Sequence, residues 1–385
     1  MPLIALSGAQ VFDGERMREG DAVLMRHGQV VDIVAASAVP PQAAVEALAG
    51  GVLAPGFVDL QVNGGGGVML GETPDTATNR ATLERIATAL RPLGTTALLP
   101  TLITADAATM AAVIAAAAGG PLPGVLGLHL EGPHLAPSRK GAHRAALMRP
   151  MTPADADALV AARARLGVLM VTLAVEQVAP ALIRRVTDAG VIVSIGHSDA
   201  SYDAARAAFD AGALCVTHLF NAMSPLTSRA PGLVGAALAC GAAWGGVIAD
   251  GHHVHPASLR IALAAKQGPG RLFLVSDAMA TAGSAIGGFD LAGVRVHRAA
   301  GRLTLADGTL AGADIDLAGS LRVLVHAVGV PLAEALRMAT TYPAALIGDA
   351  TRGRLAPGRR ADIVLLGDDL TVRRVWMAGQ AVPAG

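Results

Sequence analysis

Cysteine is scarce in this sequence, with only Cys215 and Cys240 in 385 residues. Neither belongs to a CxxC pair and both lie in apolar stretches, which excludes a disulfide framework and a cysteine-rich zinc knuckle. We therefore expect two reduced core thiols in a cytoplasmic protein.

Net charge is also lacking, because 30 basic residues balance 30 acidic ones. A chain without a basic excess is not expected to use nucleic acid or an anionic membrane surface as its main partner. Any anion-binding site must therefore be local and built by a few residues.

Long runs of Leu, Ile and Phe are missing as well. The amino terminus has no basic segment followed by a sustained apolar stretch, so no secretory signal is expected. Residues 230–249 are uncharged and as long as a membrane span, but glycine and alanine dominate them. We expect a helix and a strand of a protein core there, and no membrane partner.

The two ends of the chain share a pattern of short apolar runs separated by turn residues. Examples are LIAL and QVVDIV near the start and ADIVLL near the end. This pattern is typical of β-structure. It predicts one small β-sandwich domain formed by residues 1–54 and 355–385, leaving residues 55–354 for a separate domain.

The middle of the chain alternates short apolar stretches with longer, alanine-rich helical ones. Eight strands interleaved with helices predict a (β/α)8 TIM barrel as the catalytic domain. A doubly wound sheet with a nucleotide site is disfavoured, because NGGGGV after the first strand lacks both phosphate-loop patterns. The expected strands are residues 57–62, 95–100, 124–131, 168–175, 191–197, 214–218, 245–250 and 271–277.

Four of these eight strands end in a residue able to bind a metal or transfer a proton: Glu131, His197, His218 and Asp277. Each alone is typical of a core or capping residue, but strand ends converge on the active-site face of a barrel. One carboxylate and two imidazoles suit zinc with a position left open, and they also suit iron or another divalent metal. Asp277 is suited to acid/base work, which indicates hydrolysis at a carbonyl.

Six motifs carry a family resemblance: PGFVDLQVNG, HLEGP, GHSDA, THLFNAM, ADGHHV and LVSDAMATAG. Together they resemble the successive motifs of the amidohydrolase superfamily, and in particular its deacetylases of phosphorylated N-acetylamino sugars. The resemblance covers Pro55 to about Gly353, and GRLAPGRRADIVLL extends it toward the end. It implies hydrolysis of the acetamide of N-acetylglucosamine 6-phosphate to glucosamine 6-phosphate and acetate.

The resemblance also assigns residues. It implies that Glu131, His197 and His218 bind the metal and that Asp277 is the catalytic acid/base. His143 would contact the substrate carbonyl, with Ala142 beside it. The phosphate would be bound by Asn221, Ala222, Arg229 and His253, the last reaching in from a neighbouring subunit of a homodimer.

The sequence departs from the superfamily in two places. Many members carry HxH on the first strand, where this chain has Gln61-Val62-Asn63. Because amides are poor ligands for transition metals, one ion per subunit is favoured, with Zn²⁺ preferred and Fe²⁺ still open. In addition, Ala313 replaces the usual serine of an LAGS-like stretch, and the second copy, Leu317 to Ser320, is predicted to be helical.

Two further histidines in this region receive a structural interpretation. His129, two residues before Glu131, is expected inside the barrel as a hydrogen-bonding residue, and His134 is expected in a loop.

Other functions remain open at this point. One is a deacetylase of another N-acetylamino sugar, or a cyclic-amide hydrolase, although no lysine ends the fourth strand. Another is a non-catalytic barrel that binds phosphosugars, which the intact set of four strand-end residues argues against.

Overall fold

The computed structural model describes residues 2–291 and 293–383. Eight parallel strands form one sheet in the order β17-β16-β15-β14-β13-β12-β11-β8, so each strand pairs with its neighbour in sequence. Every predicted strand overlaps one of them. Their bounds are β8 Phe57–Val62, β11 Thr95–Ile103, β12 Gly127–Glu131, β13 Val168–Leu173, β14 Ile192–Ile195, β15 Cys215–Val216, β16 Trp244–Val247 and β17 Leu272–Leu274.

The first and last strands of this sheet meet just beyond their ends. Val62 bridges Ala278 in parallel, and the backbone N–H of Asp277 donates to the Gln61 carbonyl over 3.0 Å. The Asn63 N–H donates to the Ala278 carbonyl over 2.8 Å. These contacts close the sheet, which confirms the predicted barrel and places Asp277 beside the first strand.

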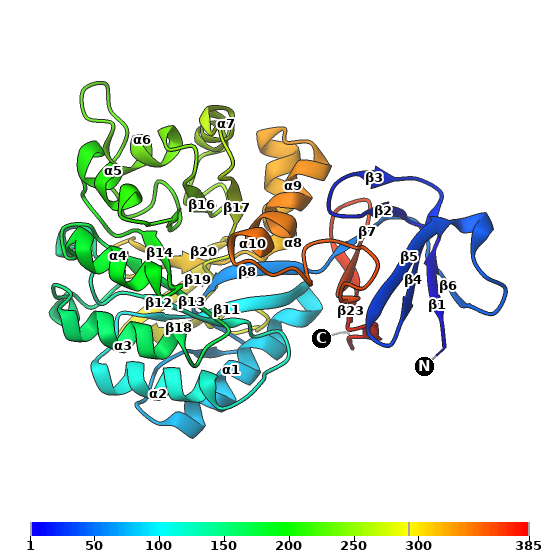
Figure 1. The fold of residues 1–385 in the computed structure, drawn as a ribbon, viewed down its shortest axis with the longest axis horizontal. Helices are drawn as coiled ribbons and strands as arrows, with labels where there is room; N and C mark the ends of the chain where they lie inside the picture. The colour runs from blue at the N-terminus through cyan, green and yellow to red at the C-terminus, as the bar shows by residue number, and fades with distance from the viewer. Residues whose placement is uncertain (1, 292, 384–385) are drawn as a thin grey trace.

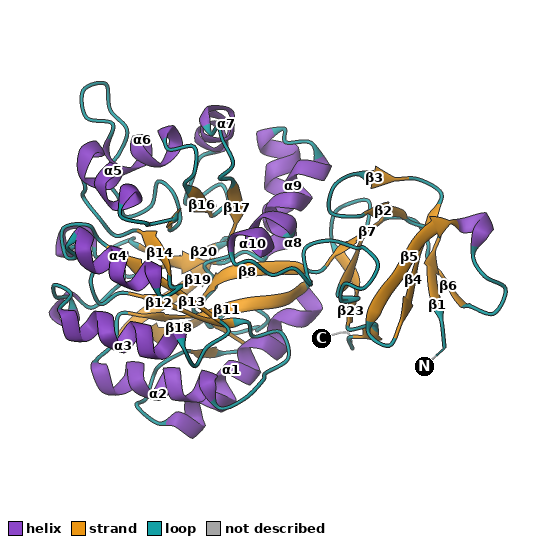
Figure 2. Ribbon diagram, viewed as in Figure 1, coloured by secondary structure: helices purple, strands orange, loops and turns teal. Residues whose placement is uncertain are grey.

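The helices lie around the outside of the barrel sheet, as Figure 2 shows. Side-chain caps mark several starts, including Asp75, Asp106 and Ser201, which each accept a hydrogen bond from the first helical turn. The α-helices are α1 Thr76–Leu90, α2 Ala107–Ala118, α3 Pro153–Arg163, α4 Pro180–Asp188, α5 Tyr202–Asp210, α6 Gly232–Ala239, α7 Pro256–Ala265, α8 Leu317–Arg322, α9 Leu332–Ala339 and α10 Thr341–Leu346. Shorter turns are η1 Ala36–Ala38, η2 Arg91–Leu93, η3 Pro137–Arg139, η4 Ala145–Leu147 and the π-helical η5 Val323–Val328.

The chain ends form two further sheets at one side of the barrel (Figure 1). The first sheet has the order β5-β4-β1-β6, and the second, β24-β23-β22-β7-β2-β3, unites strands from both ends of the chain. This arrangement confirms a small β-domain assembled from both termini. The strands are β1 Ile4–Ser7, β2 Gln10–Phe12, β3 Met17–Arg18, β4 Asp21–Arg26, β5 Gln29–Ala35, β6 Ala44–Ala47, β7 Val52–Pro55, β22 Ile363–Leu366, β23 Val372–Met377 and β24 Gln380–Ala381.

A four-stranded antiparallel meander between β17 and α8 was not predicted from the sequence. Its strands pair in the order β18-β19-β20-β21, and its core packs Phe289, Leu291 and Val296 against Met279. It brings new residues to the mouth of the barrel. The strands are β18 Gly288–Leu291, β19 Val294–Ala299, β20 Arg302–Thr304 and β21 Leu310–Ala313, and a small hairpin pairs β9 Gly64–Gly65 with β10 Val68–Met69.

The apolar stretch 230–249 folds as predicted, into α6 followed by β16. Within the described residues, no helix has the length and apolar character needed to cross a membrane. The second LAG copy is also helical as predicted, because it opens α8.

Candidate active site

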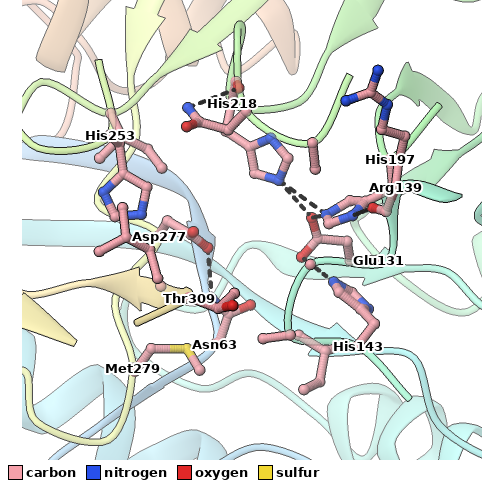
Figure 3. Close-up of a pocket in the computed structure, with 18 of the residues that line it drawn as sticks. Asn63, Glu131, Arg139, His143, His197, His218, His253, Asp277, Met279 and Thr309 are labelled. Carbon is pink, nitrogen blue, oxygen red and sulfur yellow. Dashed lines mark hydrogen bonds and ion pairs between the residues drawn. The ribbon is translucent and has the colours of Figure 1, made fainter. Parts of the chain in front are cut away.

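The predicted strand-end residues meet in one cavity of about 390 Å³ at the mouth of the barrel. This volume lies within the range of small-molecule sites, roughly 300–1,000 Å³. Figure 3 shows Glu131, His197 and His218 directed toward one another, with Asp277 and His253 on the other side of the cavity. The cavity is also lined by Asn63, Arg139, Ala142, His143, Asn221, Ala222, Met279 and Thr309.

Three side-chain atoms of Glu131, His197 and His218 form a tight triangle. Glu131 Oε1 lies 3.2 Å from His197 Nε2 and 3.1 Å from His218 Nε2, and the two nitrogens are 3.1 Å apart. A tetrahedral ion with bonds of about 2.0–2.1 Å would separate its ligand atoms by roughly 3.3 Å. The triangle therefore has the size that a metal of this kind requires.

Hydrogen bonding leaves the atoms of this triangle suited to a cation. His197 Nδ1 lies 2.7 Å from the Arg139 carbonyl, which can only accept, so Nδ1 carries a proton and Nε2 is the ring nitrogen turned toward Glu131. Burial alone would raise the pKa of Glu131, but hydrogen bonds with His197 and His218 hold it well below its ordinary value. Three electron-rich atoms so close together are stabilised by a shared positive charge.

His143 approaches the same cluster but has a different hydrogen-bonding state. The distances among Glu131, His143 and His197 would also allow a shared ion, since their ligand atoms lie within 4.8 Å of one another. However, the Thr104 backbone N–H donates to His143 Nδ1 over 3.3 Å, so the proton of the neutral ring is on Nε2. Burial lowers the pKa of His143 to about 3 and keeps the ring neutral. His143 therefore presents its Nε2–H to the cavity as a hydrogen-bond donor. His218, rather than His143, is the third member of the tighter triangle with Glu131 and His197.

Asp277 is held beside this cluster by two amides. Gln61 Nε2 lies 3.1 Å and Asn63 Nδ2 lies 2.7 Å from its Oδ1, and Gln61 Nε2 is also 3.3 Å from Glu131 Oε1. Burial raises the pKa of Asp277, and the negative charge of Glu131 raises it further. A carboxylate with a raised pKa is suited to accept a proton and then return it.

The backbone is left-handed at three of the site residues, with φ of 47° at His197, 30° at His218 and 48° at Asp277. His197 and His218 lie two residues beyond the ends of β14 and β15, and Asp277 lies three residues beyond the end of β17. This conformation is uncommon for residues other than glycine, and it persists only where the surrounding structure fixes it. The strand ends thus turn these three side chains toward one another.

Four of the remaining predicted residues line the same cavity, and one does not. Ala142, Asn221, Ala222 and His253 are all at the cavity wall of their own chain. The expectation that His253 reaches in from a neighbouring subunit is therefore wrong, because Asp250 in the same loop holds it there, with Oδ2 only 2.6 Å from His253 Nδ1.

Arg229 lies outside this cavity. It is exposed in the loop before α6 and lines a separate hollow with Asp199, Tyr202 and Pro231. The structure thus does not bring Arg229 to the other predicted site residues of its own chain.

Several cavity residues were missed at the level of sequence, among them Arg139 and Thr309. Arg139 supplies the carbonyl that fixes His197, and its guanidinium pairs with Asp199 over 2.6 Å. Thr309 comes from the unpredicted meander. Neither position has a spacing signal, because both lie in connections whose paths the strand pattern does not determine.

His129 and His134, which were interpreted as structural residues, are both buried and hydrogen-bonded in the fold. His129 is buried and hydrogen-bonded inside the barrel, with Nε2 2.7 Å from Thr172 Oγ1. His134 is also buried, and its Nδ1 lies 3.0 Å from the Arg149 carbonyl.

Known proteins share both the sequence pattern and the fold. Residues 52–382 match the Amidohydrolase family. An N-acetylgalactosamine-6-phosphate deacetylase of Shewanella sp. (strain ANA-3) is 42% identical over 336 residues, which cover 86% of this chain and 84% of that protein. An N-acetylglucosamine-6-phosphate deacetylase of Haemophilus influenzae is 36% identical over 360 residues, which cover 90% of each chain. The crystal structure of N-acetylglucosamine-6-phosphate deacetylase from Pasteurella multocida matches with a TM-score of 0.92 at 34% identity, covering 98% of this chain and 99% of that one.

The closed barrel and its Glu/His cluster define a metal-dependent hydrolase. The chain belongs to the amidohydrolase family.

Proposed function

We propose that this enzyme hydrolyses the acetamide of N-acetylglucosamine 6-phosphate, giving glucosamine 6-phosphate and acetate. The observation that carries the proposal is the convergence of His197 and His218 on one oxygen of Glu131, with the buried carboxylate of Asp277 in the same cavity. The names of the bacterial relatives support the choice of substrate class.

Glu131, His197 and His218 would hold one divalent ion per subunit, with Zn²⁺ preferred and Fe²⁺ the next choice. Such an ion supplies the Lewis acidity that makes a water reactive and an amide carbonyl electrophilic. The single-ion assignment is supported by Gln61, whose amide nitrogen faces Glu131 and Asp277 as a donor.

Asp277 would transfer the proton, and His143 would polarise the substrate carbonyl. Asp277 would accept a proton from the attacking water and then deliver it to the amine as the carbon–nitrogen bond breaks. His143, neutral and protonated on Nε2, would donate a hydrogen bond to the carbonyl oxygen as negative charge develops there. Burial in the cavity strengthens both interactions, because competing water is removed.

The phosphate would be bound by Asn221, the backbone of Ala222 and His253, all of which line the cavity. Where no metal ion binds a phosphate, backbone and side-chain N–H groups are its usual hydrogen-bond donors. Arg229 would add a charged donor from a second subunit, because its exposed loop lies outside the cavity of its own chain.

This division of the phosphate site leads us to propose a homodimer. The chain in solution should have twice its monomer mass of 38.6 kDa by light scattering. In a dimer, Arg229→Met should raise KM for the phosphorylated sugar with little change in kcat. A monomer that still prefers the phosphorylated sugar would contradict the dimer.

The C4 epimer, N-acetylgalactosamine 6-phosphate, is the second candidate substrate. It is favoured by the Shewanella relative, which is named for this sugar and is 42% identical to the chain. Both sugars present the same acetamide and phosphate, so the proposed chemistry is common to them.

Steady-state acetate release from four sugars tests the proposal: the two phosphorylated epimers and their unphosphorylated forms. We expect kcat/KM for N-acetylglucosamine 6-phosphate to exceed that for N-acetylglucosamine by at least about 100-fold, which corresponds to loss of one or two charge-assisted hydrogen bonds at roughly 1.5–3 kcal/mol each. A higher kcat/KM for the galactosamine epimer would favour the second candidate. Equal rates with and without phosphate would reject both.

A further inference from the structure

A buried chain of hydrogen bonds runs one layer deeper in the barrel than the Glu/His triangle. His129 Nε2 lies 2.7 Å from Thr172 Oγ1, Thr172 Oγ1 lies 2.6 Å from Thr217 Oγ1, and Thr217 Oγ1 lies 2.6 Å from Ser194 Oγ. All four side chains are at most 4% exposed. We name them the hydroxyl chain; it crosses β12, β13, β14 and the end of β15, the strands that lead into Glu131, His197 and His218.

The tautomer of His129, at one end of the hydroxyl chain, is fixed by its neighbours. His129 Nδ1 lies 3.2 Å from the Leu60 carbonyl, which can only accept a hydrogen bond, so Nδ1 carries the proton. The neighbouring Thr101 hydroxyl, 3.3 Å from Nδ1, has already donated its proton to the Leu99 carbonyl. His129 is buried, and the partners of its ring nitrogens are the uncharged Leu60 carbonyl and the Thr101 and Thr172 hydroxyls, so the single-proton form leaves Nε2 as an acceptor.

The direction of every other bond in the hydroxyl chain follows from this tautomer. Thr172 must donate to His129 Nε2, so its oxygen is free to accept from Thr217, which in turn accepts from Ser194. Each hydroxyl has one proton, and each donates it to the next group in the hydroxyl chain. Buried networks in which every member is satisfied rigidify the structure around them.

The hydroxyl chain adjoins both histidines of the triangle. Thr217 directly precedes His218, whose backbone is left-handed. Gly196 directly precedes His197 and packs against the hydroxyl chain so closely that a Cβ there would lie 2.8 Å from Thr217 Cβ and 2.9 Å from Thr172 Cγ2. The backbone at His197 and His218 is therefore supported by Thr172 and Thr217.

We propose that the hydroxyl chain is a positioning device for the metal site, with Thr172 as its central positioning residue. It holds the strand ends so that the nitrogens of His197 and His218 and the oxygen of Glu131 stay about 3.1–3.2 Å apart. This inference rests on the proposed role of these three residues as metal ligands. Loss of the Thr172 hydroxyl would leave His129 without its donor and Thr217 without its acceptor, and both strand ends would relax.

Thr172→Val tests the inference, because valine keeps the shape and removes only the hydroxyl. Removing outer partners of metal ligands typically weakens metal binding about 10- to 100-fold. We expect zinc to bind Thr172→Val about tenfold more weakly, measured by competition with a chromophoric chelator. At saturating zinc, kcat should fall by a similar factor and KM should change less.

Two variants separate positioning from general stability. Thr172→Ser restores the hydroxyl and should bind zinc and turn over as the wild type does. Thr96→Val makes the same substitution at a buried position outside the hydroxyl chain, where Oγ1 donates a long hydrogen bond of 3.4 Å to the Phe57 carbonyl. It should leave zinc affinity unchanged.

The outcomes are distinct. Zinc affinity and kcat in Thr172→Val equal to those of Thr96→Val would overturn the positioning role. If Thr172→Val does not fold, Ser194→Ala, which removes only the terminal hydroxyl, must still weaken zinc binding measurably for the inference to stand. Zinc binding that survives Glu131→Gln in an otherwise unchanged chain would refute the ligand assignment itself, and the inference with it.

Discussion

Replacing Asp277 with asparagine is expected to lower kcat by about 10²- to 10⁴-fold, the usual contribution of a positioned acid/base. Gln61 and Asn63 hold Oδ1 of Asp277, and no hydrogen bond to Oδ2 is found within the described residues, so Oδ2 is available for the proton. An asparagine at this position keeps the shape but accepts no proton at neutral pH. Steady-state acetate release at saturating metal and substrate measures the effect.

The matched control for this prediction is Asp362→Asn. Asp362 is also a buried aspartate, but it lies directly before β22 in the terminal sheets, where it pairs with Arg352 and Arg360. This variant should retain kcat even if its stability falls. Metal content should be unchanged in Asp277→Asn, and an Asp277→Asn enzyme with wild-type kcat would remove Asp277 from the mechanism.

Replacing Glu131 with glutamine is expected to weaken metal binding by more than about 100-fold. Loss of an outer partner already costs about 10- to 100-fold, and Glu131 is in direct contact with both histidines of the triangle. Glutamine removes the negative charge, and its NH₂ group has no lone pair for a metal. Zinc titration of the metal-depleted protein, read by calorimetry, measures the loss.

Glu334→Gln serves as its control, because Glu334 is partly buried and pairs with Arg337 and Tyr342 away from the cavity. It should bind zinc as the wild type does. Zinc binding of wild-type strength in Glu131→Gln would show that the ion is held elsewhere.

The barrel and the core of its site were predictable because parallel strands place their carboxyl ends at one face. Even β15, which is only Cys215–Val216, lies in register between β14 and β16 and delivers His218 to the triangle. Four strand-end residues thus became neighbours without any information on loops. Strand periodicity and strand order were sufficient for this part of the site.

The connections beyond the strands were less predictable, because no periodicity fixes the direction of a loop. His253 is turned into its own cavity by a contact with Asp250 three residues earlier, and Arg229 is carried outward on an exposed loop. The meander between β17 and α8 was missed because its turns, such as the one at Asp307-Gly308, interrupt the alternation of strands and helices on which the barrel prediction depended.

Acetate release from N-acetylglucosamine 6-phosphate by metal-depleted protein, before and after addition of zinc or iron, tests the central claim most directly. We predict negligible release without metal and restored release with it, and loss of that restored release in Asp277→Asn. Equal release with and without metal, or none from either phosphorylated epimer when metal is bound, would contradict it.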